Sequence, residues 1–255
     1  DKLFFFVAYD KYEEVAPLRN GPVGSGALNI EQNITLDDVT EVAQIASSVW
    51  GFDVGGFSKG PAEDEKLLAN IDWNISDSQR AKLTYIKTEG NTINEQNGNN
   101  FLASGNILGA SSAWYDRSEE VESIIGHLFS DWSDNFSTEL KIASTTQATG
   151  QDSLNGADFP SMAVMLREVD GEENYLVFGP DRFRHGNSLD QEFFQVKFVA
   201  EYSMGDHLFK VGIEREEVDV DNLFAQNSEG SYVFDSVADL QNATASGLLY
   251  DNAIT

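Results

Sequence analysis

The sequence contains no cysteine and little positive charge. Among its 255 residues, 16 Lys and Arg stand against 43 Asp and Glu, which gives a net charge of −27. A chain without cysteine forms neither a disulfide framework nor a thiolate metal site. Nucleic-acid binding needs a basic surface that faces the phosphates, so the charge argues against nucleic acid as a partner.

Long apolar runs are missing as well. The longest begins at Leu3 and reads LFFFVAY, which is far shorter than the roughly 18 residues of a membrane-spanning helix. No signal peptide is recognisable, and the chain starts inside a strand-like run. We therefore expect a mature or truncated piece of a protein.

Catalytic and metal-binding motifs are also absent. The chain has no G-x-S-x-G, Walker A or H-E-x-x-H sequence, and His127, His185 and His207 lack metal-ligand spacing. The stretch EEVDVDN (216–222) is acidic enough to attract Ca²⁺, with Asp219 and Asp221 as weak candidates. It lacks the glycine and final glutamate of an EF-hand, so a solvated strand end is the favoured interpretation. We expect no enzyme, and no cofactor apart from this surface Ca²⁺.

What the sequence does have is period-two alternation, the signature of β-strands. One set of alternating positions is apolar: Leu67, Ala69, Ile71 and Trp73; Ala81, Leu83 and Tyr85; Thr138, Leu140 and Ile142; Phe194, Val196, Phe198, Ala200 and Tyr202; and Phe209, Val211 and Ile213. The intervening positions are mostly polar or charged. In 118–132 the facing stays open, because Ile124 and Ile125 are both apolar.

Three tight turns join these runs, and each has an aromatic residue beside it. The turns read DWNISDSQR, SDWSDNFS and EYSMGDHLF. Long connections, at about 14–63, 90–118, 149–189 and 220–255, alternate with the tight turns. Transmembrane β-barrels combine short turns at one rim, long loops at the other and aromatic girdles. We therefore predict an all-β, antiparallel, up-and-down barrel segment of about seven strands, with interface aromatics at Trp73, Trp132, Phe136, Tyr202 and Phe209.

Some regular structure is predicted inside the long connections. Thr35 is a candidate N-cap with Asp38 at the third helical position, and Gly51 follows the last turn, which predicts a helix over Leu36–Trp50. A second short helix is expected from Ser236. The runs 162–167 and 175–178, separated by Asp170-Gly171, predict a β-hairpin in the third loop.

Several segments together resemble the TonB-dependent outer-membrane receptors, and in particular the large Oar-like members. They are DKLFFFVAYDKYEE, SAWYDRSEEV, HLFSDWSDNFSTELK, QDSLNGADF, GPDRFRH, DHLFKVGIEREEVDVDNLF and GSYVFDSVADL. The resemblance implies a 22-stranded barrel of the bacterial outer membrane, plugged by an N-terminal domain, that imports a ligand with energy passed on by TonB. This sequence shows no TonB box and no plug domain, so we expect residues 1–255 to be one internal region of the barrel.

The leading functional hypothesis is thus a ligand-importing receptor whose long loops recognise the ligand. Candidate contacts are Trp50, Phe52, Trp114, Tyr115, Arg182 and Arg184. The two arginines form the densest basic cluster and could bind an anionic group or neutralise loop carboxylates. Expected partners are the unknown ligand, TonB through the missing plug, and outer-membrane lipopolysaccharide bridged by divalent cations. A passive porin and a soluble β-rich carbohydrate-binding module are the alternatives.

Overall fold

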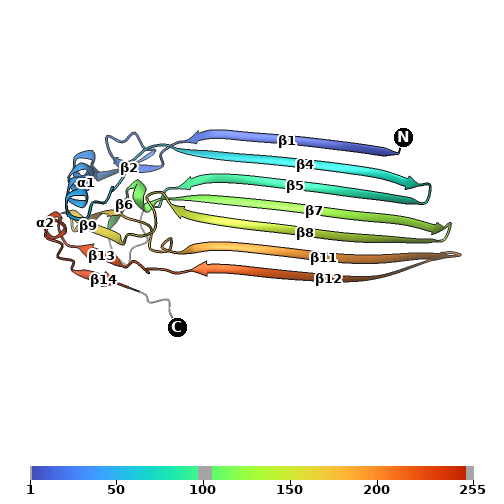
Figure 1. Ribbon diagram of the computed structural model, residues 1–255. Helices are drawn as coiled ribbons and strands as arrows, with labels where there is room; N and C mark the ends of the chain where they lie inside the picture. Colours follow the sequence, from blue (N-terminus) through green and yellow to red (C-terminus); the bar gives the residue numbers. More distant parts are fainter. Residues whose placement is uncertain (1, 97–104, 251–255) are drawn as a thin grey trace.

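A single long sheet of seven strands dominates the structure (Figure 1). The computed structural model describes residues 2–96 and 105–250. In sheet order the strands are β1 (Leu3–Ala16), β4 (Gly60–Ser76), β5 (Gln79–Asn94), β7 (Tyr115–Ser133), β8 (Phe136–Ser153), β11 (Asn187–Met204) and β12 (His207–Phe224). All neighbours pair antiparallel, which confirms the up-and-down arrangement. The three tight turns lie at one end of the sheet.

The strands continue a few residues further than the apolar alternation predicts, so the long connections are shorter than expected. The first long connection spans 17–59 rather than 14–63, the second 95–114, the third 154–186, and the fourth begins at 225. Parts of the loops expected at 90–118 and 220–255 lie outside the described residues. The acidic stretch 216–222 is inside β12. Strand pairing uses backbone groups, so it continues through acidic residues where the alternation is lost.

The long connections fold together into a compact unit at the other end, which we call the head. Its elements are β2 (Asn20–Val23), β3 (Asn29–Thr35), α1 (Leu36–Trp50), β6 (Asn106–Gly109), the 3₁₀ turn Ser111–Ala113, β9 (Ser161–Val169), β10 (Glu172–Phe178), β13 (Ser231–Phe234), α2 (Val237–Gln241) and β14 (Gly247–Leu249). The predicted hairpin is confirmed as β9–β10. It belongs to a five-stranded sheet ordered β14-β13-β9-β10-β6, in which β10 pairs with β6, and β9 with β13, in parallel.

Both predicted helices are confirmed with their caps. The Thr35 side chain accepts a hydrogen bond from the Asp38 amide, and the Asp38 carboxylate accepts one from the Thr35 amide, which completes a capping box. Gly51 ends α1 in the left-handed conformation, with φ of 67°. Helix α2 begins after Ser236, whose hydroxyl accepts a hydrogen bond from the Asp239 amide.

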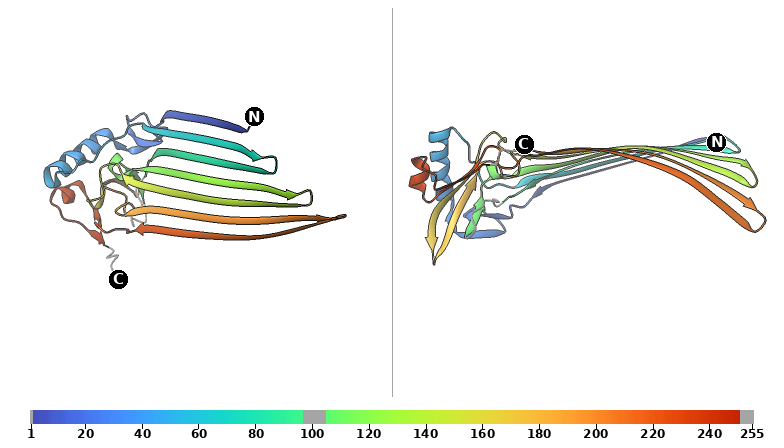
Figure 2. Two further views of the ribbon diagram at one scale, coloured as in Figure 1. Left: turned by 45° about the vertical axis from the view of Figure 1, so that its right-hand side comes forward. Right: turned by 90° about the horizontal axis from the view of Figure 1, so that it is seen from below.

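The main hydrophobic core of the described residues lies in the head, not in the long sheet. Buried side chains from α1, α2, the five-stranded sheet and their connections form it: Val39, Val42, Ala46, Val54, Ala110, Met162, Val164, Leu176, Phe178, Phe234 and Leu240. Figure 2 shows the long sheet as one thin, bent layer, with the hairpin β9–β10 turned out of its plane. Side chains such as Phe5 and Ile213, 81% and 73% exposed, have no second layer to pack on.

The long sheet has two open edges, β1 and β12, and no pair of strands within residues 2–96 and 105–250 closes it into a barrel. Because the number of strands is odd, β1 and β12 run in the same direction, from the tight turns toward the head. Antiparallel pairing of these two edges with each other is thus impossible. Neither of the two described helices is long and apolar enough to span a membrane.

The head core predicts a test of its independence from the sheet. Phe178 is fully buried in the core, so Phe178→Ala is expected to destabilise the head by about 3–5 kcal/mol. Thermal melting followed by near-ultraviolet circular dichroism measures this loss. Phe5→Ala, which truncates a side chain that is 81% exposed on the sheet, is the control and should leave the head transition in place. Equal melting of the two variants contradicts a separate head core.

Candidate functional site

The strand register sorts the side chains of the long sheet onto two faces. Residues directly opposite each other on neighbouring strands share a face. Trp73 of β4 pairs with Leu3 of β1 and Ala81 of β5. The same row continues through Leu128, Leu140, Phe198 and Ile213. One row of the sheet is therefore apolar across all seven strands.

Rows on either side extend this into a region without a charged side chain, which we call the belt. Its residues are Leu3, Phe5, Val7 and Tyr9; Leu67, Ala69, Ile71 and Trp73; Ala81, Leu83 and Tyr85; Ile124, Gly126, Leu128, Ser130 and Trp132; Phe136, Thr138, Leu140 and Ile142; Phe194, Val196, Phe198, Ala200 and Tyr202; and Phe209, Val211 and Ile213. The facing predicted from the alternation is confirmed. The register also settles the open case: Ile124 lies in the belt, and Ile125 lies on the opposite face.

The five predicted interface aromatics all lie in the belt, at the end with the tight turns. Tyr202 pairs with both Phe136 and Phe209, which gives a row of three rings on adjacent strands. The indole Nε1 of Trp132 donates to the Thr138 hydroxyl at 2.9 Å. The Trp73 side chain is about half exposed. Their placement at a membrane interface stays a prediction.

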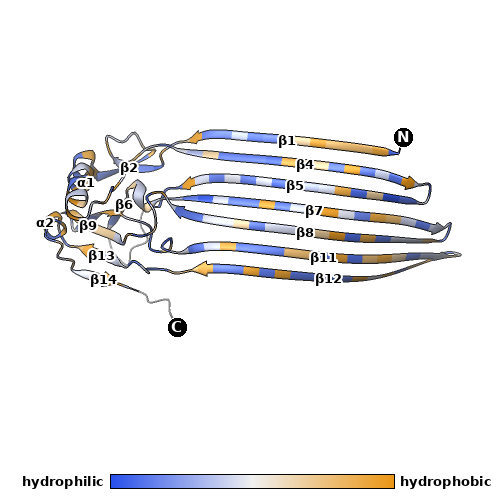
Figure 3. Cartoon of the chain, viewed as in Figure 1, coloured by the Kyte–Doolittle hydropathy of each residue, from blue (hydrophilic) through white to orange (hydrophobic). Residues whose placement is uncertain are grey.

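The belt covers a length of strand that compares with a lipid-facing band. On β4 it runs from Leu67 to Trp73 and on β11 from Phe194 to Tyr202, which at 3.3 Å per residue is about 20–27 Å along the strands, and on β5 and β12 it covers about 13 Å. A tilt of the strands makes the height of the belt smaller than these lengths. Transmembrane barrels have an apolar band of about 25 Å. Figure 3 shows the apolar colour gathered in the half of the strands near the tight turns.

The borders of the belt run obliquely across the strands. Tyr9 of β1 pairs with Leu67, both still apolar, whereas the same row on β12 is already Asp219. The positions of the tight turns shift across the sheet in the same direction. Trp73 lies beside the first turn and shares its row with Ile213 of β12, but the turn before β12 lies beside Phe209, four residues earlier. A band of constant height that crosses strands at an angle is what tilted barrel strands require.

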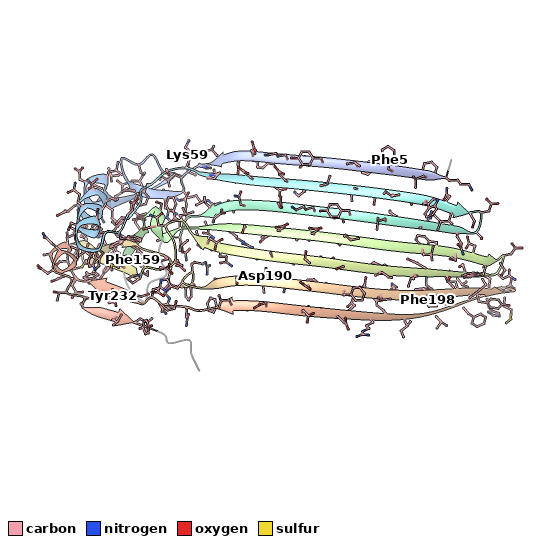
Figure 4. All side chains as sticks on the ribbon, viewed as in Figure 1. Phe5, Lys59, Phe159, Asp190, Phe198 and Tyr232 are labelled. Carbon is pink, nitrogen blue, oxygen red and sulfur yellow. The ribbon has the colours of Figure 1, made fainter. Side chains whose placement is uncertain are left out.

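Above the belt, toward the head, the same face becomes acidic. This acidic band contains Glu13, Glu63, Glu65, Glu89, Glu120, Glu122, Asp190, Glu192, Glu217, Asp219 and Asp221. Lys11 and Lys87 each contact two of these carboxylates. Figure 4 labels Asp190 in this band and Phe198 in the belt, two levels of one strand.

Two of the six candidate ligand residues pack in the head core. The Phe52 ring stacks on Phe159 with 3.7 Å between centroids, and Trp50 lies against Phe234 at 6.2 Å. Both are partly buried against the core. Figure 4 labels Phe159 and, on β13, Tyr232 in this packed region.

Trp114 and Tyr115 lie where the head joins the sheet and do not form an exposed rim. Their exposures are 2% and 6%. The Trp114 indole donates to the Gly109 carbonyl at 2.9 Å, and its ring meets Phe57 edge to face. The Arg184 guanidinium lies 4.3 Å from the centre of the Tyr115 ring and donates to its hydroxyl. The structure thus brings Tyr115 and Arg184 together.

Arg182 is apart from that pair. Its guanidinium lies 4.5 Å from the centre of the Phe183 ring, and its carbonyl accepts from the Asn227 amide. The segment that carries both arginines is held by Asp181. This residue is 2% exposed, and its carboxylate accepts a hydrogen bond from the Phe183 amide. Ligand contact by the six candidates stays a prediction. For Trp114 and Tyr115, packing between the head and the sheet is a sufficient reason for an aromatic residue at these positions.

Within residues 2–96 and 105–250, no three acidic or histidine side chains converge to hold a metal ion. Asp219 and Asp221 lie in the acidic band, opposite Glu192 and Asp190 of β11, and Ca²⁺ binding by them stays a prediction. The alternation within single strands indicates the belt and the acidic band only in part. The signal was in the sequence as the change from apolar to acidic within each strand, but the register between strands was needed to align the changes.

The chain matches no known family model, and no curated protein or solved structure is significantly similar to it. The likeness to TonB-dependent receptors therefore rests on the motifs of the sequence alone, and it stays a hypothesis.

His185, in the same cluster as the arginines, predicts a pH dependence of the head. Burial lowers the pKa of its imidazole to about 4, and its Nδ1 accepts from the Glu229 amide. Because the folded pKa lies below the unfolded value of about 6.5, stability is complete above pH 6.5 and falls as the pH drops toward 4. The imidazole is only partly buried, so we expect a loss of about 1–2 kcal/mol, discounted for solvent screening.

Melting of the head at pH 7 and pH 4.5 measures this effect as a difference between variants. His185→Gln should lose less stability than the natural chain over that interval. His207 lies at an exposed turn of the long sheet, and the His207→Gln variant should lose as much stability as the natural chain. It is the control, because it keeps all the carboxylates that also titrate over this interval. Identical pH profiles for all three chains rule out the role of His185.

Proposed function

We propose that this chain is a segment of an outer-membrane β-barrel receptor that imports a ligand. The observation that carries the proposal is the belt: a charge-free face that covers about 20–27 Å along β4 and β11, on a sheet with no second layer. Monomeric soluble proteins rarely expose apolar patches beyond a few hundred Å². A bilayer of matching height covers such a face without any further protein layer.

The order of features along the strands supports one orientation. Short turns and aromatic residues lie at one end of the belt, and the acidic band and the head lie at the other. In barrels of this kind the short turns are periplasmic and the long connections extracellular. The head is then the ligand-recognising part, outside the cell. The acidic band lies at the level of the lipid headgroups, where divalent cations bridge its carboxylates to lipopolysaccharide.

The open edges support a larger barrel. β1 and β12 cannot pair antiparallel with each other, so closure takes additional strands, as in the 22-stranded barrels that the motifs resemble. In such a receptor a plug fills the barrel and contacts TonB. The opposite face of the sheet, with its mid-strand charges, then faces the interior.

Cysteine labelling tests the membrane placement, because the chain has no cysteine of its own. Val7 and Val15 lie on the same face of β1 and are 60% and 68% exposed, but only Val7 is in the belt. In lipid vesicles, a membrane-impermeant maleimide should label Val15→Cys and leave Val7→Cys largely unlabelled. After detergent denaturation both should react equally, which serves as the control.

Equal labelling of both cysteines in vesicles, or a folded monomer in plain buffer, contradicts the membrane placement and favours the soluble binding module. Protection of Val7→Cys together with a steady open-channel conductance in planar bilayers supports the passive porin instead of a plugged receptor.

A further inference from the structure

The face opposite the belt carries basic side chains in one row across four neighbouring strands. Lys82 of β5 pairs with His127 of β7, His127 with Lys141 of β8, and Lys141 with Lys197 of β11. Directly opposite residues share a face, and neighbouring strands lie about 4.8 Å apart, so this basic row is about 14 Å long. It crosses the middle of the sheet at the level of the belt.

The row stands out because most other lysines of this acidic chain are engaged by carboxylates. Lys11 lies 2.9 Å from Glu65, and Lys66 and Lys87 have carboxylates at 2.8 and 2.5 Å. In contrast, no ion pair in the described part of the chain includes Lys82 or Lys141. Two lysines on either side of His127 thus keep their ammonium donors free.

The carboxylates next to the row are at its ends or are already bonded. Asp72 and Glu214 terminate the row on β4 and β12. Glu214 accepts a hydrogen bond from the Gln195 amide and lies 4.0 Å from Lys197. Glu139 contacts the imidazole of His127 at 3.1 Å. The acidic ends confine an anion to the central strands.

The surroundings strengthen the attraction of the row for an anion. Lys82, His127 and Lys141 are only partly exposed, and Ala143 and Val199, on the same face, are 9% and 7% exposed. Charges that are partly withdrawn from water interact more strongly than fully solvated ones. An ammonium group offers three donors and no acceptor, so its complement is an acceptor-rich group.

We propose that the basic row is a binding site for a small multivalent anion, an organic phosphate or a polycarboxylate. Lys82 and Lys141 hold the anion from both sides of β7, and Lys197 adds a third charge on β11. The site follows from the strand register and does not rest on the proposed membrane role. In the proposed barrel this face lines the interior, so a transported anion meets the row midway along the strands.

The test is a calorimetric titration of the folded chain in detergent at low salt, with pyrophosphate and with citrate as probes. Binding of the first identifies phosphate chemistry and binding of the second identifies carboxylate chemistry. A triple variant with Lys82→Gln, Lys141→Gln and Lys197→Gln is expected to bind about 100-fold more weakly, because each lost charge-assisted hydrogen bond lowers the affinity. Added salt should weaken binding to the natural chain.

The matched control removes three positive charges elsewhere: Lys11→Gln, Lys66→Gln and Lys87→Gln. It should bind within about twofold of the natural chain, because these three lysines lie outside the row and are already paired with carboxylates. If the first triple variant does not keep its far-ultraviolet dichroism, Lys82→Gln and Lys141→Gln are measured singly, with about tenfold weaker binding expected of each.

Three outcomes overturn the proposal: no binding of either probe, an equal loss in the two triple variants, or binding of an oligoglutamate peptide to the row when both small anions fail. The last result would assign the face to an acidic polypeptide. None of these outcomes depends on lipid, so they are distinguishable from a failure of the cysteine-labelling test.

Discussion

The belt without a covering layer is the constraint on which the rest of this structure depends. Backbone hydrogen bonds hold the seven strands side by side. In the unfolded chain the same backbone groups bond to water, so each of these hydrogen bonds adds only modestly to the stability of the fold. Apart from Tyr115 at the head end, the buried side chains on the sheet are few and small, such as Ser123, Ala143 and Val199. The apolar rows stabilise the structure only when another layer removes them from water. Within the described residues the long sheet thus has no covering layer, whereas the head carries its own core.

Under the proposed function, the acidic band marks the level at which the lipid cover of the belt ends. Its carboxylates repel one another, and the ion pairs made by Lys11, Lys87 and Arg215 are exposed pairs worth little each. Water and counter-ions stabilise the carboxylates of this band, whereas removal from water stabilises the apolar side chains of the belt. The two regions meet within single strands such as β4, where Glu65 is followed by Leu67 on the same face. Under the proposed function, this change from acidic to apolar residues fixes the level of the sheet relative to the membrane interface.

Local signals in the sequence were sufficient for the parts of the fold that local chemistry decides. The capping box of Thr35 and Asp38 and the turn at Asp170-Gly171 specify α1 and β9–β10 from a few neighbouring residues. They were insufficient where pairing joins distant segments. Strand β6, which pairs with β10, and strand β13, which pairs with β9, are each four residues long. They are too short to show a periodicity. The candidate ligand residue Trp114 looked like a loop aromatic, because its burial comes from contacts made across the head.

The direction of the strands also decides what can complete the sheet under the proposed function. A second copy that paired its β12 with this one about a twofold axis would run antiparallel to it, so aligned belts would place the two heads on opposite sides of one bilayer. A receptor that recognises its ligand on one side has no use for that arrangement. Strands that alternate with β12 in the same chain keep all long connections at one rim. The polarity of the belt, the acidic band and the head therefore favours closure by further strands of one barrel over pairing of two copies.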